Sequence, residues 1–152
     1  MKVVVETTTD IDQPMLTLRL PPDYPQREDL IQALEKVTLA PATLTVSQRG
    51  QTTQLPLNEL MFIEATGHQV AAHTSTAVYR VPSSLTALGS ALPSNFIRVS
   101  KSALVNTDMV HALTKTLTGN LIEFDHSPKQ LYASRRYYQP LKVVLEEKGL
   151  LL

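Results

Sequence analysis

The most informative stretch of this chain is NFIRVSKSALVN, residues 95–106. Its apolar positions supply material for a core. Between them stand hydrogen-bond donors, namely Arg98, Ser100, Lys101, Ser102 and Asn106. Cations and short polar groups on strand ends and a loop suit phosphate oxygens and base edges. A solvated strand edge has the same composition, and composition alone favours that simpler interpretation.

Short strands surround this stretch on both sides. TLTVSQ, residues 43–48, alternates apolar with polar side chains, and Arg49-Gly50 provides a two-residue turn into the next strand. One short helix is expected after a cap at Ser83 or Ser84. Without alternating helices to cover a parallel sheet, the pattern predicts a mainly β fold, either a sandwich or a partly closed barrel. The predicted strands cover residues 43–48, 51–55, 60–63, 69–74, 77–81, 96–106, 109–116, 120–126 and 130–133.

Residues 1–41 are predicted to form a small extension of their own, joined to a domain over residues 42–152. MLTLRL, residues 15–20, alternates as a strand does, and residues 27–37 carry apolar side chains at helical spacing. So short a segment cannot bury a stable core alone. We therefore expect it to dock on the rest of the chain or on a second copy, as a dimerisation or regulatory element.

The C-terminal segment predicts a helix that begins near Gln139. Pro140 deep inside a helix would cost about 3 kcal/mol, whereas the first turn tolerates proline. Residues 134–138 would then form an exposed loop.

This loop carries Arg135 and Arg136. The planar fork of an arginine can grip guanine O6 and N7 together. Alternatively, the two arginines pair with surface carboxylates such as Glu146 or Glu147, which would contribute little to stability.

The composition excludes several classes of protein. The chain has 152 residues, 43% of them apolar, and no cysteine. Zero cysteines exclude a disulfide scaffold, thiol catalysis and a cysteine zinc site, and they favour a cytoplasmic location. No apolar run approaches the roughly 20 residues needed to cross a bilayer, and the start lacks the pattern of a signal peptide.

The formal net charge is zero, which argues mildly against nucleic acid as a partner. The charge is unevenly distributed, however. Residues 1–64 hold 5 Lys/Arg and 9 Asp/Glu, and residues 65–152 hold 9 and 5. Such asymmetry fits an acidic accessory part joined to a basic, anion-facing part, although a chain of this size can show it by chance.

Catalytic and metal-binding motifs are not evident. The chain has no serine in a nucleophile elbow and no glycine-rich phosphate loop. His68 and His73 would point to opposite faces of one strand, and His111 and His126 lack carboxylates at ligand spacing. We therefore predict a protein that is not an enzyme and that uses no cofactor, metal or small-molecule substrate.

Three segments together resemble the LytTR family of bacterial DNA-binding domains. These are LMFIEA (60–65), LPSNFIRVSKSALVN (92–106) and YASRR (132–136), and the resemblance extends over about residues 43–148. It implies an elongated fold of about ten strands in stacked antiparallel sheets with little helix. It also implies a transcription regulator that inserts loops into successive major grooves, bends the duplex and places two copies on direct repeats.

The resemblance implies a role for six residues. His68, Lys101 and Arg136 match the family's base-reaching positions. Arg98, Ser102 and Arg135 match positions suited to phosphate contacts or to supporting the loops. The sequence departs from the family at Ser100, where many relatives have histidine.

The resemblance also implies partners. We expect double-stranded DNA and a homodimer. Residues 1–41 are too few for the receiver domain that many relatives carry, so we do not expect input by that route. Standalone relatives are often encoded beside a membrane protein that holds them inactive, which implies such a regulator here.

A second hypothesis retains the same fold but assumes no DNA binding. In it, the chain is a β-rich protein–protein interaction module that sequesters a partner or is sequestered by one, and its basic loops are merely solvated. Salt separates the two hypotheses, because phosphate contacts weaken steeply with ionic strength and apolar contacts do not.

Overall fold

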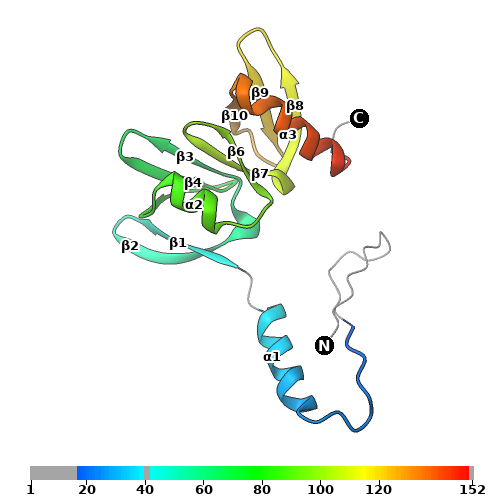
Figure 1. Cartoon of the computed structure of the whole chain (residues 1–152). Helices are drawn as coiled ribbons and strands as arrows, with labels where there is room; N and C mark the ends of the chain where they lie inside the picture. Colours follow the sequence, from blue (N-terminus) through cyan, green and yellow to red (C-terminus); the bar gives the residue numbers. More distant parts are fainter. Residues whose placement is uncertain (1–16, 40–41, 151–152) are drawn as a thin grey trace. The chain divides into compact units, whose positions relative to one another are not determined.

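The computed structural model describes residues 17–39 and 42–150 (Figure 1). The chain divides into two compact units, Met1–Ala40 and Pro41–Leu152. Within the described ranges, no helix is both long and apolar enough to span a bilayer.

The first unit contains α1, Arg27–Leu39, which confirms the predicted helix. Glu28 and Asp29 lie in its first turn, where their negative charges interact favourably with the helix dipole. The strand predicted over residues 15–20 is wrong where it can be tested, because residues 17–20 are irregular and residues 15 and 16 lie outside the described ranges. A strand needs a neighbouring backbone to pair with, and the described part of this unit supplies only a helix and turns.

The second unit is built on a seven-stranded sheet in the order β2-β1-β5-β4-β3-β7-β6. Every neighbouring pair is antiparallel. The single strand predicted over residues 96–106 is in fact two strands joined by a turn at Lys101-Ser102. The strands are β1 Thr43–Gln48, β2 Gln51–Pro56, β3 Phe62–Thr66, β4 Gln69–His73, β5 Val78–Val81, β6 Phe96–Ser100 and β7 Ala103–Asn106.

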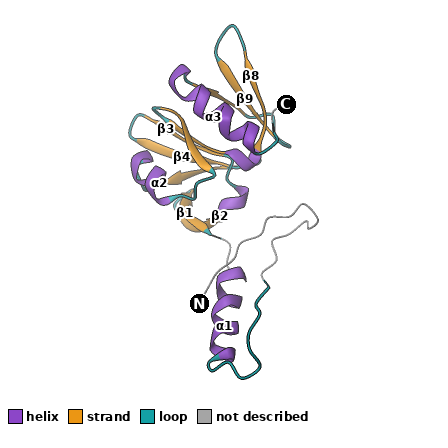
Figure 2. Cartoon of the chain, turned by 45° about the vertical axis from the view of Figure 1, so that its right-hand side comes forward, coloured by secondary structure: helices purple, strands orange, loops and turns teal. Residues whose placement is uncertain are grey.

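A three-stranded sheet in the order β10-β9-β8 completes the strands of this unit. It consists of β8 Val110–Lys115, β9 Asn120–Phe124 and β10 Gln130–Ala133. Figure 2 shows the helices α2 (Leu85–Ala91) and α3 (Arg135–Glu147) with the strands. Ser84 caps α2, its hydroxyl accepting the Ala87 N–H at 3.1 Å. Two 3-10 turns, η1 Leu57–Glu59 and η2 Thr107–Met109, lie between strands.

The start of α3 differs from the prediction. The helix begins at Arg135, one turn before Gln139, so residues 135–138 are helical and not a loop. The Ser134 N–H donates to the Val99 carbonyl at 2.8 Å, which fixes Ser134 in an extended conformation at the helix cap. Pro140 lies inside the helix, where it removes one backbone hydrogen bond. Burial of Leu141 and Leu145 offsets this loss, since each leucine contributes roughly 1.5–3 kcal/mol.

Two apolar cores lie on opposite faces of the large sheet. One holds α2 with Leu60 and Ile63, and the other holds α3 and the small sheet with Met61 and Phe62. Phe62 and Ile63, the first two residues of β3, therefore serve different cores, as the alternation of a strand requires, and Leu60 and Met61 before them are divided between the same two cores. This explains why Leu60–Ile63 is a continuous apolar run.

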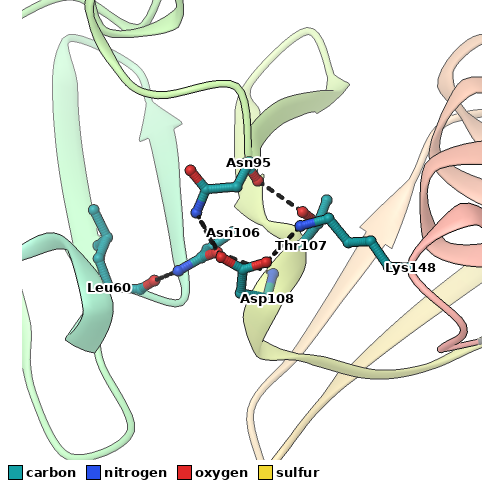
Figure 3. A network of polar contacts seen from close by, with 6 residues as sticks. All are labelled: Leu60, Asn95, Asn106, Thr107, Asp108 and Lys148. Carbon is teal, nitrogen blue, oxygen red and sulfur yellow. Dashed lines mark hydrogen bonds and ion pairs between the residues drawn. The ribbon is translucent and has the colours of Figure 1, made fainter. Parts of the chain in front are cut away.

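A buried polar network closes one end of the second unit (Figure 3). Asn106 is buried, and its amide donates to the Leu60 carbonyl at 2.8 Å. Its side-chain oxygen accepts from Asn95 and from the Asp108 backbone N–H, each at 3.0 Å. Lys148 at the end of α3 pairs with Asp108. The network thus links β3, β7, η2 and α3.

His73, the last residue of β4, and Lys129 lie at this same end of the sheet. Lys129 donates from Nζ to the carbonyls of Thr74 and Ala77, at 2.7 and 3.1 Å. The ring of His73 stacks on Phe62 with centroids 4.2 Å apart. Burial, aided by the Lys129 cation, lowers the pKa of His73 to about 4. The Glu64 carboxylate, 3.9 Å away and half exposed, is too well solvated to reverse this shift.

Acidification should therefore destabilise the chain through His73. The unfolded chain binds a proton at the ordinary histidine pKa, whereas the folded chain binds it only near pH 4, so stability present above pH 6.5 is lost as the pH falls. Between pH 6.5 and 5.5 the expected loss is about 1 kcal/mol. Urea unfolding of wild type and His73→Gln at both pH values measures it. An equal pH dependence in the two proteins would contradict the assignment.

Candidate nucleic-acid interface

The turns β3–β4 and β6–β7 lie next to each other, at the end of the sheet opposite the polar network. Glu64 on β3 pairs with Ala103 on β7, and beyond this pair the Ala65 N–H donates to the Ser102 carbonyl at 2.8 Å. His68 is exposed in the β3–β4 turn, where Gly67 has a φ of +61°. The register of the two strands therefore brings His68 and Lys101 to one edge.

The β6–β7 turn is held by its own side chains. The Ser100 hydroxyl accepts the Ser102 N–H at 3.2 Å and lies 3.3 Å from the Ser102 hydroxyl. The Arg98 guanidinium donates to the Lys101 carbonyl at 2.7 Å. These bonds fix the backbone of the turn and leave the Lys101 side chain exposed.

The first turn of α3 adjoins this same turn. The register between β6 and β7 shifts between Arg98 and Ser100, and there the Val99 carbonyl accepts the Ser134 N–H at 2.8 Å. Ser134 is thereby anchored to Val99 in β6, two residues before Lys101. Arg135 and Arg136 follow at once and are exposed.

Three separate segments thus meet at one end of the sheet. We call this the turn surface, and it comprises residues 66–69, 101–102 and 134–136. Exposed on it are His68, Lys101, Ser102, Arg135 and Arg136.

The arginines of the turn surface are available for a ligand. Arg136 lies 5.5 Å from the ring of Tyr137. The alternative pairing with Glu146 or Glu147 is not formed, and the Glu146 carboxylate instead lies 3.6 Å from Lys142. In the described part of the chain, the four salt bridges involve neither arginine.

The charged group of Arg98 is already hydrogen-bonded within the chain. Its guanidinium holds the Lys101 carbonyl, so of the two roles considered for it, loop support agrees with the contact observed. Sequence pattern alone could not decide this, because a strand residue three positions before a turn can point either way.

The remaining histidines do not build a metal site. Among residues 17–39 and 42–150, no group of three or more histidine and acidic side chains could hold an ion. His111 does approach a carboxylate, with Nδ1 3.0 Å from Asp125, and this pair was missed because the two residues are far apart in sequence.

The β8–β9 turn also reaches this end of the unit, which the sequence did not reveal. Lys115 pairs with Asn120, and Asn120 pairs in turn with Ala133, the residue before Ser134. The turn Thr116–Gly119 therefore projects beside the start of α3 (Figure 1). Its only sequence signal was Gly119-Asn120, which indicates a turn and nothing of its neighbours.

Comparison with known proteins agrees with this geometry. The family model of the LytTr DNA-binding domain matches residues 50–146. The chain belongs to the LytTR family. A similar solved structure is the LytTr DNA-binding domain of a protein named as a methyl-accepting/DNA response regulator from Bacillus cereus, with a TM-score of 0.63 and 20% identity. The match covers 70% of this chain and 98% of that one.

Comparison with curated proteins gives no significant match. The mainly β LytTR fold and the family resemblance seen in the sequence are confirmed by the family model and the solved structure. Membership of the LytTR family implies DNA as a partner.

The turn-supporting role of Arg98 in this LytTR domain gives a prediction. Arg98→Ala should weaken DNA binding about threefold to tenfold by loosening the turn, a loss of about 1 kcal/mol typical of one hydrogen bond. Because the Arg98 guanidinium is held by the Lys101 carbonyl, we expect it to make no phosphate contact, and the dependence of affinity on salt should stay as in the wild type. Fluorescence anisotropy over a range of salt concentrations measures both. A salt slope shallower by one unit would instead place Arg98 on a phosphate.

Proposed function

We propose that this chain is a transcription regulator that binds double-stranded DNA sequence-specifically and is not an enzyme. The turn surface inserts its loops into successive major grooves, with two copies on direct repeats. The observation that carries the proposal is the Ser134–Val99 hydrogen bond, because it sets Arg136 beside the turn that presents Lys101.

The chemistry of the turn surface suits this function. Arg136 and Lys101 are exposed cations, which can bind guanine O6 and N7 in the major groove. His68 reaches a base from the neighbouring turn, and Ser102 and Arg135 contact phosphates. Because the cations are concentrated on one edge of a chain of zero net charge, nonspecific binding stays weak and base contacts provide discrimination.

The remaining parts of the proposal concern partners and location. Residues 1–41 act as the dimerisation or regulatory docking element of a cytoplasmic homodimer, and residues 42–152 act as the DNA-binding domain. A membrane protein that holds the regulator inactive fits the same element.

Selection from a pool of random duplexes tests the proposal. The full chain should enrich one motif in two copies separated by about one helical turn. Binding to the enriched duplex should weaken steeply with salt, with a slope of about −0.9 for each phosphate neutralised. Failure to enrich any motif, with weak binding that ignores salt, would favour the protein–protein interaction module.

Lys101→Ala makes the test specific to the turn surface. We expect weaker binding to the enriched duplex by about 1–3 kcal/mol if Lys101 reaches a base, and a salt slope reduced by about one if it reaches a phosphate. Lys142→Ala is the matched control, because Lys142 pairs with Glu146 on α3. Equal affinities and equal slopes for wild type and Lys101→Ala would remove Lys101 from the site.

A further inference from the structure

The β8–β9 hairpin presents an exposed leucine beside the turn surface. Leu117 is fully exposed at the tip of the hairpin. The strand register places the root of the hairpin level with Ala133, one residue before Ser134 and the two arginines. The side chain of Asn120 reinforces this alignment by donating to the Ala133 carbonyl at 3.1 Å.

The tip is firmly held. The Thr116 hydroxyl donates to the Gly119 carbonyl at 2.8 Å and accepts the N–H groups of Gly119 and Thr118, at 3.1 and 3.3 Å. The backbone adds a bond from the Thr116 N–H to the same carbonyl at 2.8 Å. A leucine kept in water on a turn with this many bonds is preorganised for contact with a partner.

The surroundings of the tip combine neutral polar and aromatic side chains with one cation. Residues 113–122 contain no acidic side chain. Lys115 Nζ lies 5.5 Å from the centre of the Tyr138 ring. Tyr132 is half exposed, and its ring packs against Gly119 so closely that a Cβ there would lie 3.1 Å from it. Such a surface matches the negative backbone of DNA and the thymine methyl groups in its major groove.

A broad protein interface fits the tip less well. Stable protein contacts bury about 800 Å² on each partner, usually around a cluster of apolar anchors. One leucine and one half-exposed tyrosine offer much less, whereas a single leucine is sufficient to meet one methyl group.

We propose that Leu117 is a further DNA contact, which reads the 5-methyl group of a thymine next to the base pair contacted by Arg136. This inference rests on the proposed function. Lys115, held over Tyr138, supplies a cation for the phosphate backbone at the same place.

Replacement of single thymines by uracil tests the contact, because uracil lacks only the methyl group. The probe is the duplex enriched by the full chain from random sequences. We expect wild type to lose about fourfold in affinity at one or two thymines, as removal of one buried carbon predicts. Leu117→Ala should bind the thymine duplex about threefold to tenfold more weakly and should not distinguish uracil from thymine there.

Val78→Ala is the matched control, since Val78 is an exposed aliphatic residue at the start of β5, away from the turn surface. It should keep both the affinity and the uracil profile of the wild type. Exposure of Leu117 also means that its replacement should leave the unfolding midpoint unchanged.

Two results would overturn the inference about Leu117. One is a Leu117→Ala protein with the affinity and uracil profile of the wild type, although Lys101→Ala weakens binding. The other is a defect seen only on duplexes with two sites, which would place Leu117 against a second copy. If wild type enriches no duplex at all, the proposed function itself fails.

Discussion

Arg136→Ala should bind the enriched duplex about 1–3 kcal/mol more weakly than wild type, a loss of roughly 5- to 150-fold. Arg136 is exposed at the start of α3 and its position is fixed by the Ser134–Val99 hydrogen bond. Its guanidinium can give two parallel hydrogen bonds to one guanine. Loss of both hydrogen bonds should relax the base preference at that one base pair and leave the base preferences at the other positions intact.

Two further variants make the Arg136 result specific. Arg136→Lys keeps the charge but not the fork, so it should recover little discrimination at that base pair. Arg49→Ala removes an exposed arginine from the β1–β2 turn, at the end of the sheet opposite the turn surface, and should bind as wild type does. Binding measured by anisotropy on duplexes mutated one base pair at a time decides between these outcomes. A uniform loss over all duplexes would make Arg136 a phosphate contact.

Asn106→Ala should lower the free energy of unfolding by about 2–4 kcal/mol. Asn106 is buried at 2% exposure, and its amide bridges the Leu60 carbonyl, the Asn95 side chain and the Asp108 backbone. Its removal leaves the buried Leu60 carbonyl without the amide donor and the Asp108 N–H without its acceptor, and a polar group left in this way costs roughly 1–3 kcal/mol. The loss comes from the end of the sheet opposite the turn surface.

Urea unfolding measures this loss. Asn58→Ala is the matched control, because Asn58 is an exposed asparagine in η1 and its replacement should cost less than about 0.5 kcal/mol. At a temperature where both variants remain folded, Asn106→Ala should keep the salt slope of DNA binding. Unfolding at the wild-type urea concentration would show that the network contributes nothing to stability.

The alternation of apolar residues predicted most strands, and the structure shows where this signal stops. Residues 96–106 look like one strand because both halves are apolar, and the turn at Lys101 depends on the Ser100 hydroxyl bond. The start of α3 depends on the Val99 carbonyl, far away in sequence. Neither hydrogen bond can be inferred from the local sequence pattern.

The candidate site was predictable in its residue types and family position, but not in its arrangement. Lys101 and Arg136 follow from the resemblance, whereas their neighbourhood depends on the register of β3, β6 and β7. The roles of Arg98 and Leu117 could not be inferred from sequence. One depends on a side-chain contact with a carbonyl and the other on the alignment of three strands.

The central claim is that two turns and the start of α3 form one DNA-contacting surface, and an NMR titration tests it most directly. The enriched duplex is added to the ¹⁵N-labelled chain while backbone amide signals are followed. We predict that the shifts concentrate at residues 66–69, 101–102 and 134–136, with residues 74–77 and 125–129 unchanged. Shifts concentrated at residues 74–77 and 125–129, with the three segments of the turn surface unchanged, would contradict the account.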